Sequence, residues 1–446
     1  MKVLVIGAGG REHALVWKLR ESQLVTDIYC APGNPGIGQE AECLAVDLSS
    51  PDSILDLARR LSADLTIVGP EGPLVAGVAD LFSKAGLRII GPSKAAARLE
   101  GSKAYAKRFM QKYGIPTARF VVAENFANAV RSLGEFRLPV VVKADGLAAG
   151  KGVVVARRRE DAEKALDDFM RQGTLGAAGE RVVIEECLDG DELSFIVLAD
   201  SRGILPLAPS QDYKPVFDHD EGPNTGGMGA SSHDAIISSL ERDAIVRSLV
   251  RPAIEGMAAE GTPYRGFLYC GLMLTVSGPK VLEFNCRLGD PETQPIMMRL
   301  RSDLVELLLA TWDGHLGGLE AHWTPNPSVC VVLASRGYPG EPEVGKVVVG
   351  VDAAEALGGV KVFFAGTKMS DKHLITTSGR VLGVTAIGQD LASAVQRAYA
   401  GVSKIQFEGM HYRHDIGSRT PRGFPGPQSS SQPPRPGQAR PGAAKV

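Results

Sequence analysis

Short apolar segments alternate with longer amphipathic segments over the first 95 residues. The apolar segments are rich in β-branched residues and are KVLVIG (2–7), DIYCAP (27–32), LTIVG (65–69) and LRIIGP (87–92). Helix-like stretches lie between them, at 11–22 and 50–64. Strands that alternate with helices form a parallel sheet with crossover helices. The pattern therefore predicts a doubly wound α/β domain at the N-terminus.

A second set of patterns follows a helix predicted at 101–114, which Pro116 ends because proline cannot continue a helix. Residues 120–184 predict a small unit in the order strand, helix, strand, glycine-rich loop, strand, helix, strand. Residues 193–319 carry longer apolar strands separated by long polar loops, which in compact enzymes are usually binding loops. A final strand-rich region has predicted strands at 328–337, 345–350, 360–367 and 380–388 and a closing helix at 390–405.

These patterns predict an α/β protein of several domains, since 446 residues are too many for one ordinary core. The expected domains are an N-terminal parallel-sheet domain at 1–120, a small lid domain at 121–190, a larger mixed α+β domain at 191–325, a strand-rich C-terminal domain at 326–417 and a tail at 418–446. The tail has seven prolines and no acidic residue, and it is too poor in apolar residues to build a core. We expect it to be disordered.

Composition narrows the class of function. The net charge is −2, and no basic block precedes the extreme C-terminus, which argues against a nucleic-acid partner. The six cysteines are scattered without a C-x-x-C spacing and are expected to be buried thiols in a reducing cytosol. No apolar run reaches the roughly 20 residues that span a bilayer, and the first residues begin a strand at once, leaving no room for a signal peptide. We expect a cytoplasmic, monomeric enzyme that acts on small molecules without a membrane partner.

The first candidate site is the glycine-rich turn GAGGREH at 7–13. A dinucleotide fingerprint needs a third glycine where this chain has Glu12, and an acidic residue after the second strand, where it has Cys30 and Ala31. The turn therefore argues against a nicotinamide dehydrogenase. Glycines at a strand-to-helix turn can still present backbone N–H groups to a substrate phosphate, or they can serve tight packing alone. The residues concerned are Gly9, Gly10 and Arg11.

The second candidate is KADGLAAGKG at 143–152, directly behind an apolar strand. It differs from a phosphate-binding P-loop, because only three residues separate Gly146 from Gly150 and because Gly152 stands where that motif needs Ser or Thr. The next segment, GVVVA, is a predicted strand, so the loop joins two strands and offers no helix N-terminus. We predict a flap over phosphates, with Lys143 at the end of one strand.

Two further segments carry paired polar residues. Glu283 and Asn285 alternate in a predicted strand, so both face one side, where oxygen ligands suit a hard cation such as Mg²⁺. Arg287 follows at the strand end as a predicted anion clamp. Glu185 and Glu186 end another apolar strand, either as a solvated strand end or beside an adenine edge, with Glu192 available to accept ribose hydroxyls.

The loop SQDYKPVFDHDEGPNTGGMGA at 210–230 is the fourth candidate. It is polar and ends in small residues, which is typical of a substrate loop, whereas isolated apolar residues within it argue against disorder. The predicted substrate residues here are Asp212, Lys214, Asn224, Thr225, Gly226 and Gly227, joined by Asp290 in GDPETQP.

Taken together, these motifs resemble the phosphoribosylamine-glycine ligase family of the ATP-grasp superfamily. The resemblance rests on VLVIGAGGREHAL, LTIVGPE, LEGSKA, KADGLAAGKGV, PNTGGMGA and EFNCRLGDPETQP, and it extends from Met1 to about Ile416. It implies a ligase that uses ATP with Mg²⁺, or Mn²⁺, to join glycine to 5-phosphoribosylamine in de novo purine synthesis. The family's scheme passes through glycyl phosphate and needs no covalent enzyme intermediate.

The resemblance also implies residue roles. Lys143 and Arg287 would act catalytically on the phosphoryl group, and Glu283 with Asn285 would hold the metal. The residues implied for ATP are Lys103, Lys143, Gly150, Lys151, Gly152, Glu185, Glu186, Leu188 and Glu192. The sequence departs from the family after SQD, where His-Lys-Arg is frequent and this chain has Tyr213, Lys214 and Pro215. It departs again after GGMGA, where Ser231 and Ser232 replace Tyr and Ser.

Two alternatives remain beside this prediction. Another ATP-grasp carboxylate-amine ligase would share the nucleotide residues, although PNTGGMGA and GDPETQP are not its signature. A catalytically inactive nucleotide-binding regulator would lack some of the charged set, whereas Lys143, Glu283, Asn285 and Arg287 are all present.

Overall fold

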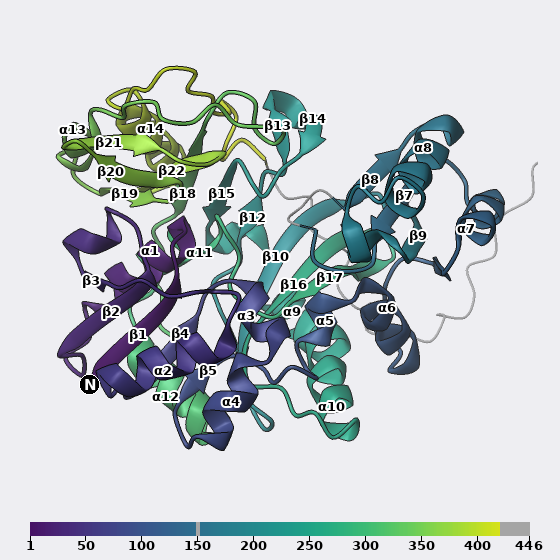
Figure 1. The fold of residues 1–446 in the computed structure, drawn as a ribbon, viewed down its shortest axis with the longest axis horizontal. Coiled ribbons are helices and arrows are strands. Elements are labelled where there is room, and N and C mark those ends of the chain that lie inside the picture. The colour runs from purple at the N-terminus through teal and green to yellow at the C-terminus, as the bar shows by residue number, and fades with distance from the viewer. Residues whose placement is uncertain (149–151, 420–446) are drawn as a thin grey trace, which may run out of the picture.

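The computed structural model describes residues 1–148 and 152–419 of the chain (Figure 1). Within these ranges the strands form four sheets of four or five strands and two separate hairpins. The α/β fold class predicted from the sequence is confirmed. The predicted flap residues Gly150 and Lys151 and the predicted tail from residue 420 onward lie outside the described residues.

The N-terminal sheet is parallel and has the strand order β3-β2-β1-β4-β5. Val3 and Val5 of β1 belong to one hydrophobic cluster and Leu4 and Ile6 to another, so both faces of the strand are buried. This explains why the strand is apolar throughout rather than alternating. The strands are β1 (Lys2–Gly7), β2 (Asp27–Pro32), β3 (Glu42–Cys43), β4 (Leu65–Val68) and β5 (Ile89–Ile90), and the helices are α1 (Gly10–Leu19), α2 (Pro51–Leu61), α3 (Glu71–Ala76) and α4 (Val78–Lys84).

The helix predicted at 101–114 corresponds to α6 (Lys103–Lys112), and a short separate helix, α5 (Arg98–Gly101), precedes it. Ser102 separates them because its backbone is extended, with φ −144° and ψ 111°. Its hydroxyl accepts a hydrogen bond from the Tyr105 N–H and so caps α6. The predicted helix therefore begins at Lys103 rather than at residue 101, because the capping serine precedes it.

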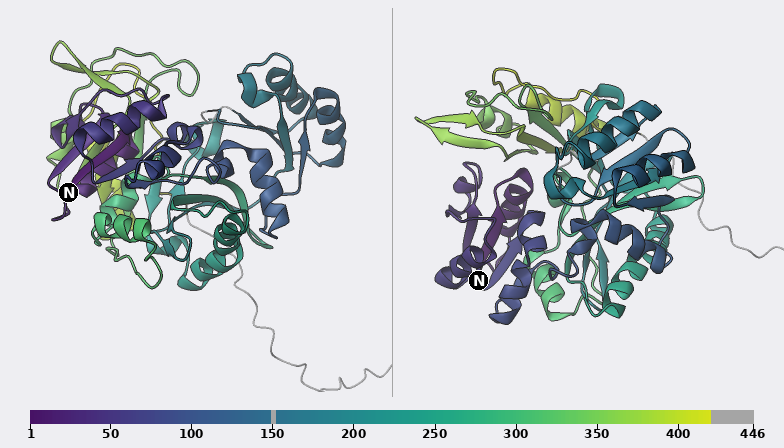
Figure 2. Two further views of the ribbon diagram at one scale, coloured as in Figure 1. Left: turned by 60° about the horizontal axis from the view of Figure 1, so that its bottom comes forward. Right: turned by 45° about the vertical axis from the view of Figure 1, so that its right-hand side comes forward.

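The lid, defined as residues 120–186, follows the predicted order of strands and helices. Its antiparallel sheet has the order β6-β9-β7-β8, and the glycine-rich loop connects β7 to β8, which pair directly. The prediction that this loop joins two strands is confirmed. In Figure 1 and the left view of Figure 2 the lid projects from one side of the molecule. Its elements are β6 (Phe120–Ala123), α7 (Phe126–Ser132), β7 (Val140–Ala144), β8 (Val153–Ala156), α8 (Arg159–Met170) and β9 (Val182–Glu186).

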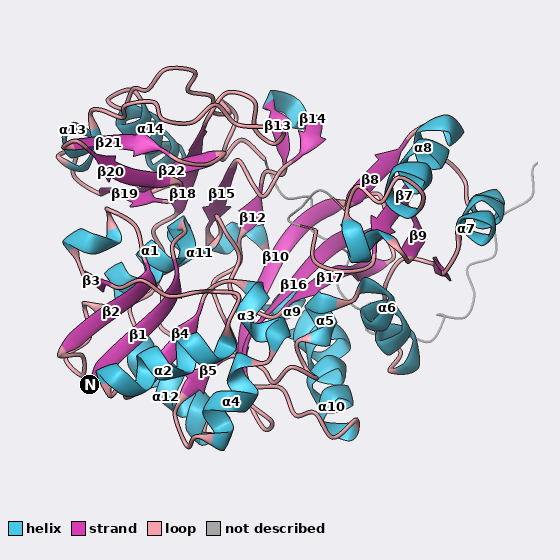
Figure 3. Cartoon of the chain, viewed as in Figure 1, coloured by secondary structure: helices cyan, strands magenta, loops and turns pink. Residues whose placement is uncertain are grey.

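A second antiparallel sheet, in the order β11-β10-β16-β17, forms the centre of the molecule. Figure 3 shows β10, β16 and β17 side by side, with the lid strands beyond their far ends. Cys270 and Leu272 of β16 pack in one cluster with Ile254 and Met257 of α10, which covers one face. The elements are β10 (Asp191–Ala199), β11 (Ile204–Pro206), α9 (Ser239–Ile245), α10 (Arg251–Ala259), β16 (Gly266–Thr275) and β17 (Gly278–Asn285).

The C-terminal sheet has the order β12-β15-β18-β22-β19, so it takes two strands from the segment 191–325. Helix α14 packs against β18 and β22, and α11 lies between this sheet and α1. Two hairpins, β13-β14 and β20-β21, stand beside the sheet. The remaining elements are β12 (Gln211–Asp212), β13 (Pro215–Phe217), β14 (Glu221–Asn224), β15 (Gly229–Ser232), α11 (Thr293–Arg299), α12 (Leu304–Asp313), β18 (Ser328–Ala334), α13 (Val351–Glu355), β19 (Val360–Phe364), β20 (Thr367–Ser370), β21 (His373–Thr376), β22 (Arg380–Ile387) and α14 (Leu391–Val402).

The strand predicted at 345–350 is wrong. Val347 and Val349 form only isolated bridges, to Ile375 and Gln406, and both side chains are exposed. Val348 between them is buried in the C-terminal core, but the run forms no continuous ladder with a neighbouring strand of the described chain and is therefore not a strand. In the described part of the chain, no helix has the length and apolar character needed to cross a bilayer.

Candidate active site

A cavity of about 760 Å³, here called the main cavity, lies where the lid, the central sheet, the N-terminal domain and the C-terminal domain meet. It gathers side chains from segments that are far apart in the sequence, between Ala8 and Arg380. The predicted site residues that line it are Gly9, Arg11, Lys103, Lys143, Gly152, Asp212, Lys214, Thr225, Gly226, Glu283, Asn285, Arg287 and Asp290.

Lys143, at the end of β7, lies at the boundary between the lid and the central sheet. Its ammonium group contacts the carboxylate of Glu185 and donates to the Leu282 carbonyl at 3.3 Å. Lys107 of α6 contacts the same carboxylate, so Glu185 lies between two lysines, and all three side chains are buried. Burial raises the pKa of Glu185, but the two lysines outweigh this effect and hold that pKa below its usual value.

The pKa of Lys107 falls to about 8, because burial exceeds the attraction of Glu185. Glu185 was expected either at a solvated strand end or beside an adenine edge. Its carboxylate is buried between two lysines rather than solvated, and its place beside an adenine stays a prediction. Its neighbour Glu186 accepts a hydrogen bond from the Arg119 N–H at 2.9 Å. The carboxylate of Glu185 therefore holds the lysine that reaches the central sheet, a role that strand-end patterning alone cannot reveal.

Lys103 begins α6 beside the start of the flap. Its ammonium group donates to the Gly146 carbonyl at 3.0 Å. The Asp145 carboxylate accepts from the Ser102 hydroxyl at 2.9 Å and from the Ala104 N–H at 3.0 Å, so the strand end of the lid is bound to the helix N-terminus. Burial lowers the pKa of Lys103, and Lys143 adds to this effect, against the attraction of Glu283. Two cations thus face the cavity from one corner.

Glu283 and Asn285 both line the main cavity, as the strand alternation predicts. Phe284 packs in the core and also forms part of the cavity lining, whereas Cys286 lies in the core alone. Among residues 1–148 and 152–419, neither the Glu283 nor the Asn285 side chain forms a hydrogen bond or a close ion pair. Burial raises the pKa of Glu283, but Lys214, Lys143 and Lys103 outweigh it and lower that pKa. A carboxylate and an amide oxygen that face a cavity without partners fit a hard divalent cation.

Arg287, the predicted anion clamp, is held by carboxylates of the protein. Its Nε lies 2.9 Å from Glu71 and its Nη2 lies 3.0 Å from Glu100, while Nη1 donates to the Leu288 carbonyl. Both glutamates line the cavity, and sequence reasoning assigned neither of them a role. Glu71 had a detectable signal, since it follows the strand β4 in GPE at the carboxyl edge of a parallel sheet.

The glycine-rich turn at the start of α1 already holds an anion. The Glu12 carboxylate accepts from the Gly9 N–H at 2.6 Å and lies 2.6 Å from Arg11 Nε. A Cβ at Gly69 would lie 1.9 Å from this carboxylate, so glycine is needed for close packing there. Gly10 does not line the cavity and faces Gln294 and Asp290. The Gly9 N–H group is therefore bound to Glu12 in this structure, and the role of the turn in binding a substrate phosphate stays a prediction.

The loop with Asp212 and Lys214 faces the cavity from the opposite side. Lys214 Nζ lies 2.9 Å from Glu192 and 3.9 Å from Asp212, so Glu192, expected on a ribose, pairs with a lysine here. Burial raises the pKa of Asp212 to about 7, with Glu292 and Glu192 adding to the rise and Lys214 opposing it. Glu292 also lines the cavity and accepts from the Ser194 hydroxyl at 2.9 Å.

The segment PNTGGMGA is fixed by the C-terminal domain. Arg380 donates to the Gly226 carbonyl at 2.8 Å and to the Asp290 carbonyl at 2.6 Å, and the Tyr338 hydroxyl accepts from the Gly226 N–H at 2.8 Å. Gly227 has φ +113°, and a Cβ there would lie 2.4 Å from Pro291, so only glycine fits. Sequence reasoning missed the C-terminal residues that complete the lining, which are Tyr338, Ala365, Gly366, Thr367, Thr377, Ser378, Gly379 and Arg380.

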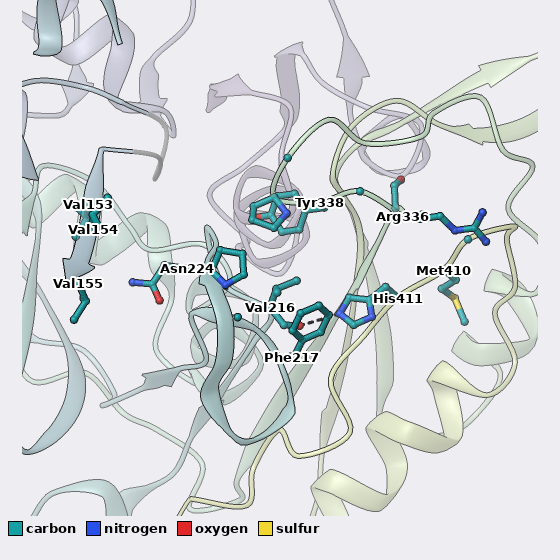
Figure 4. Close-up of a pocket in the computed structure, with 17 residues that line it drawn as sticks. Val153, Val154, Val155, Val216, Phe217, Asn224, Arg336, Tyr338, Met410 and His411 are labelled. Carbon is teal, nitrogen blue, oxygen red and sulfur yellow. Dashed lines mark hydrogen bonds between the residues drawn. The ribbon is translucent and has the colours of Figure 1, made fainter. Parts of the chain in front are cut away.

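A second cleft, of about 1100 Å³, lies between the lid strand β8 and the C-terminal domain (Figure 4). Val155, Phe217 and Tyr338 line it, and none of its lining residues carries a carboxylate. Asn224, predicted as a substrate residue, lines this cleft rather than the main cavity. The other predicted residues in the described chain that do not line the main cavity are Gly10, Glu185, Glu186, Leu188, Glu192 and Gly227.

Models of three domains of one family match the chain. They are the phosphoribosylglycinamide synthetase N domain at residues 1–100, its ATP-grasp (A) domain at 101–293 and its C domain at 328–419. Phosphoribosylamine–glycine ligase of Xylella fastidiosa (strain Temecula1) is 52% identical over 423 residues, which cover 94% of this chain and 98% of that protein. The enzyme of the same name from Pseudomonas aeruginosa is 50% identical over 422 residues, with the same coverage of both chains.

Solved structures agree with these matches. The crystal structure of phosphoribosylamine–glycine ligase from Thermotoga maritima superimposes with a TM-score of 0.82 at 35% identity, covering 93% of this chain and all of that one. A biotin carboxylase from Campylobacter jejuni, at 15% identity and a TM-score of 0.69, shares the fold alone and covers 92% of each chain. The chain belongs to the phosphoribosylglycinamide synthetase family, and its central domain is an ATP-grasp domain.

Proposed function

We propose that this chain is an ATP-dependent ligase that joins glycine to 5-phosphoribosylamine, giving glycinamide ribonucleotide, ADP and phosphate in de novo purine biosynthesis. The single observation that carries the proposal is the cavity in which Lys143, Glu283 and Asn285 face Asp212 and Lys214. Cationic and oxygen-donor groups on one side suit a nucleotide phosphate and its cation, and mixed charges on the other suit small polar substrates. The family membership described above supports the same reaction.

In the first step an oxygen of the glycine carboxylate attacks the γ-phosphorus of ATP, the bond to the β,γ-bridging oxygen breaks, and ADP leaves. Negative charge is concentrated at the transferred group, so catalysis depends on positioning and charge neutralisation. Lys143 and Lys103 supply cations on the lid side, and Gly152 and the predicted flap residues Gly150 and Lys151 belong to the proposed phosphate cover. Arg287, fixed by Glu71 and Glu100, presents a rigid positive charge to the same cavity.

We propose that Glu283 and Asn285 hold Mg²⁺, with Mn²⁺ as the alternative ion to test. When bound there, such a cation would neutralise negative charge on the phosphates. The adenine and ribose remain assigned, by resemblance, to Glu185 and Glu186 at the end of β9, Leu188 in the connection that follows and Glu192 at the start of β10. When a ribose is bound, the Glu192 carboxylate must then either separate from Lys214 or accept hydrogen bonds from the ribose while it stays paired with that lysine.

In the second step the amine of 5-phosphoribosylamine attacks the glycyl carbonyl carbon, the bond from that carbon to the phosphate oxygen breaks, and the proton lost by the nitrogen passes to the departing phosphate. We assign Asp212 and Lys214 to these small substrates, with Thr225, Gly226, Gly227 and Asp290 beside them and Asn224 at the margin. Gly9, Gly10 and Arg11 remain the residues proposed to bind the substrate phosphate. Acyl phosphates hydrolyse readily, so the enclosed cavity is needed to exclude water during the transfer.

Release of ADP by the purified protein tests the proposal. It is expected to require both glycine and 5-phosphoribosylamine, the latter generated in the assay, and to stop when the divalent cation is chelated. ADP release that is independent of glycine, or better supported by another amino acid, would contradict the proposal.

We also propose that the protein is a cytoplasmic monomer without nucleic-acid or membrane partners. Sedimentation of the purified chain at the mass of a dimer would contradict the monomeric state.

A further inference from the structure

Tyr213 lies between two cavity residues but faces the other way. Asp212 and Lys214 line the main cavity, whereas the Tyr213 ring is fully buried in the C-terminal core. Successive side chains of an extended segment point to opposite sides, which explains this arrangement. The segment therefore has a cavity side, which carries the charged groups, and a rear side, which is fixed by the C-terminal domain.

The rear side is held by the last described residues of the chain. The Arg419 guanidinium lies 4.2 Å from the centre of the Tyr213 ring and that of Arg413 lies 5.1 Å from it. The Tyr213 hydroxyl accepts from the Gly417 N–H at 2.9 Å and from the Arg419 N–H at 3.3 Å. One buried side chain is thus enclosed by residues that follow it by some 200 positions in the sequence.

The same two arginines also bind the main chain on either side of Tyr213. Arg419 Nη1 donates to the Asp212 carbonyl at 2.7 Å, and Arg413 Nη1 donates to the Pro215 carbonyl at 3.0 Å. Pro215 has no N–H group, so its carbonyl is its only backbone hydrogen-bonding group. The backbone from 212 to 215 is therefore fixed at both ends by guanidinium groups.

The arginines are themselves fixed by carboxylates. Arg413, fully buried, lies 3.0 Å from Asp220 and 2.7 Å from Asp415, and Arg419 pairs with Asp220. Buried charges are tolerated when they are paired and hydrogen-bonded, as these are. The arrangement is rigid and charge-balanced, and it stands where the sequence departs from the family pattern, at Tyr213 and Pro215.

We propose that residues 413–419 form a C-terminal latch that positions the Asp212 and Lys214 side chains for the small substrates, with Tyr213, Arg413 and Arg419 as positioning residues. The proposal rests on the proposed function, which assigns Asp212 and Lys214 to glycine and 5-phosphoribosylamine. The latch touches no reacting atom and acts through the backbone of the loop.

Arg419 also acts on Asp212 through its charge. The charged groups that face Asp212 are Lys214 on its own segment, Glu192 of β10, Glu292 before α11 and Arg419 of the latch. Burial raises the pKa of Asp212 to about 7, the two glutamates raise it, and Lys214 and Arg419 lower it. Loss of Arg419 is therefore expected to raise this pKa further, and Asp212 would need a higher pH to ionise.

The test compares Arg419→Met and Arg419→Lys with the wild type under steady-state conditions. Since a charged hydrogen bond to the loop is lost, Arg419→Met is expected to raise the KM of glycine or of 5-phosphoribosylamine about tenfold while leaving the KM of ATP unchanged. The acidic limb of its pH–activity profile is expected to move to higher pH, and Arg419→Lys is expected to restore the limb in part. Arg397→Met is the control, because Arg397 also donates to a backbone carbonyl, of Ile387, in the same domain.

Two truncations make the test independent of side-chain substitution. A chain that ends at Arg419 keeps the latch and is expected to match the wild type. A chain that ends at Gly417 lacks Arg419 and is expected to behave like Arg419→Met. Equal kinetics of the two truncated chains, or an Arg419→Met defect no larger than that of Arg397→Met, would overturn the latch.

Failure of the proposed function is recognised separately, since the wild type would then release no glycine-dependent ADP. The latch would still be tested by thermal unfolding, in which the pH-dependent difference between the wild type and Asp212→Asn reports ionisation of Asp212. Arg419→Met is expected to shift that dependence to higher pH. An unshifted dependence would overturn the latch whatever the reaction proves to be.

Discussion

Glu185 of the lid and Glu283 of the central sheet are two carboxylates that both lie near lysines. Glu185 forms ion pairs with its lysines, whereas Glu283 forms none among the residues that the structure describes. Lysines lower the pKa of both against the effect of burial. Glu185 is in direct contact with Lys107 and Lys143. In the described part of the chain, Glu283 has no such contact, although Lys143 donates to the carbonyl of the preceding residue, Leu282.

The difference separates a supporting role from a binding role. A buried carboxylate that is fully paired is expensive to disturb, because removing it leaves its partners charged and unsatisfied. A carboxylate that faces a cavity without a partner of its own keeps its lone pairs for a ligand. Glu185 therefore orders the lysines, and Glu283 is available to a cation. This comparison predicts that mutation of one affects stability and mutation of the other affects turnover.

The largest expected effect is that of Glu283→Gln. The substitution removes a negative charge from the proposed metal site and keeps the shape of the side chain, so turnover is expected to fall by about a thousandfold. The melting temperature is expected to stay close to that of the wild type. ADP release measured over a range of Mg²⁺ and Mn²⁺ concentrations checks this, together with calorimetric titration of each metal.

Glu306→Gln provides the matched control, since Glu306 is an exposed glutamate on α12. It is expected to match the wild type in metal affinity and turnover. A fully active Glu283→Gln variant with unchanged metal affinity would remove Glu283 from the site and end the contrast with Glu185.

Glu185→Gln is expected to act mainly on stability. It leaves Lys107 and Lys143 buried without their carboxylate, which is expected to cost about 3 kcal/mol and to lower the melting temperature. Asp168→Asn, which breaks an exposed ion pair with Lys164 in the same lid, is the control and is expected to leave the melting temperature unchanged. Equal melting temperatures of Glu185→Gln and the wild type would show that the buried group of three charges has no supporting role.

A double-mutant cycle of Lys143→Met and Glu185→Gln sharpens the comparison. Lys143 is expected to serve both sides, holding Glu185 and facing the phosphates, so Lys143→Met is expected to lower turnover about a hundredfold. In thermal unfolding the two substitutions are expected to be non-additive by about 2 kcal/mol, because they remove one shared contact. Additive effects would mean that the contact contributes nothing to stability.

Much of the fold could be predicted from the sequence, because most strands here are short apolar runs whose period matches their burial. The lid shows this best, since Val142 and Ile184 pack inward at the predicted spacing and the glycine-rich loop joins two paired strands. The prediction failed at 345–350, where Val348 is buried but the run forms only isolated bridges to its neighbours. The sequence could not predict that β12 and β15 belong to the C-terminal sheet. These strands have only two and four residues, and β15 joins the sheet by pairing with β18, which is distant in the sequence.

The site was predictable where one segment carries the whole signal, as in the alternation of Glu283 and Asn285. It was not predictable where a side chain's partner comes from elsewhere in the chain. Glu185 proved to lie between two lysines from different elements, Glu192 to pair with Lys214, and Arg380 to bind the loop at Gly226. No spacing in the sequence reports such contacts, since each depends on how domains pack.

The smallest expected effect concerns Asp212, a third buried carboxylate that differs from the other two because its pKa is raised, to about 7, from 3.8. A raised pKa means that the folded protein favours the protonated acid. The resulting stability is fully present below about pH 4, where the unfolded chain is also protonated, and is lost as the pH rises through 7. Asp212→Asn cannot ionise, so the stability of the wild type relative to this variant is expected to fall as the pH rises from 4 to 8. Melting temperatures of both proteins across that range check it, and the difference between them cancels the contributions of all other titrating groups. A difference that is constant with pH would mean that Asp212 ionises normally in the folded protein, and that Lys214 and Arg419 together offset its burial, as the lysines do for Glu185 and Glu283.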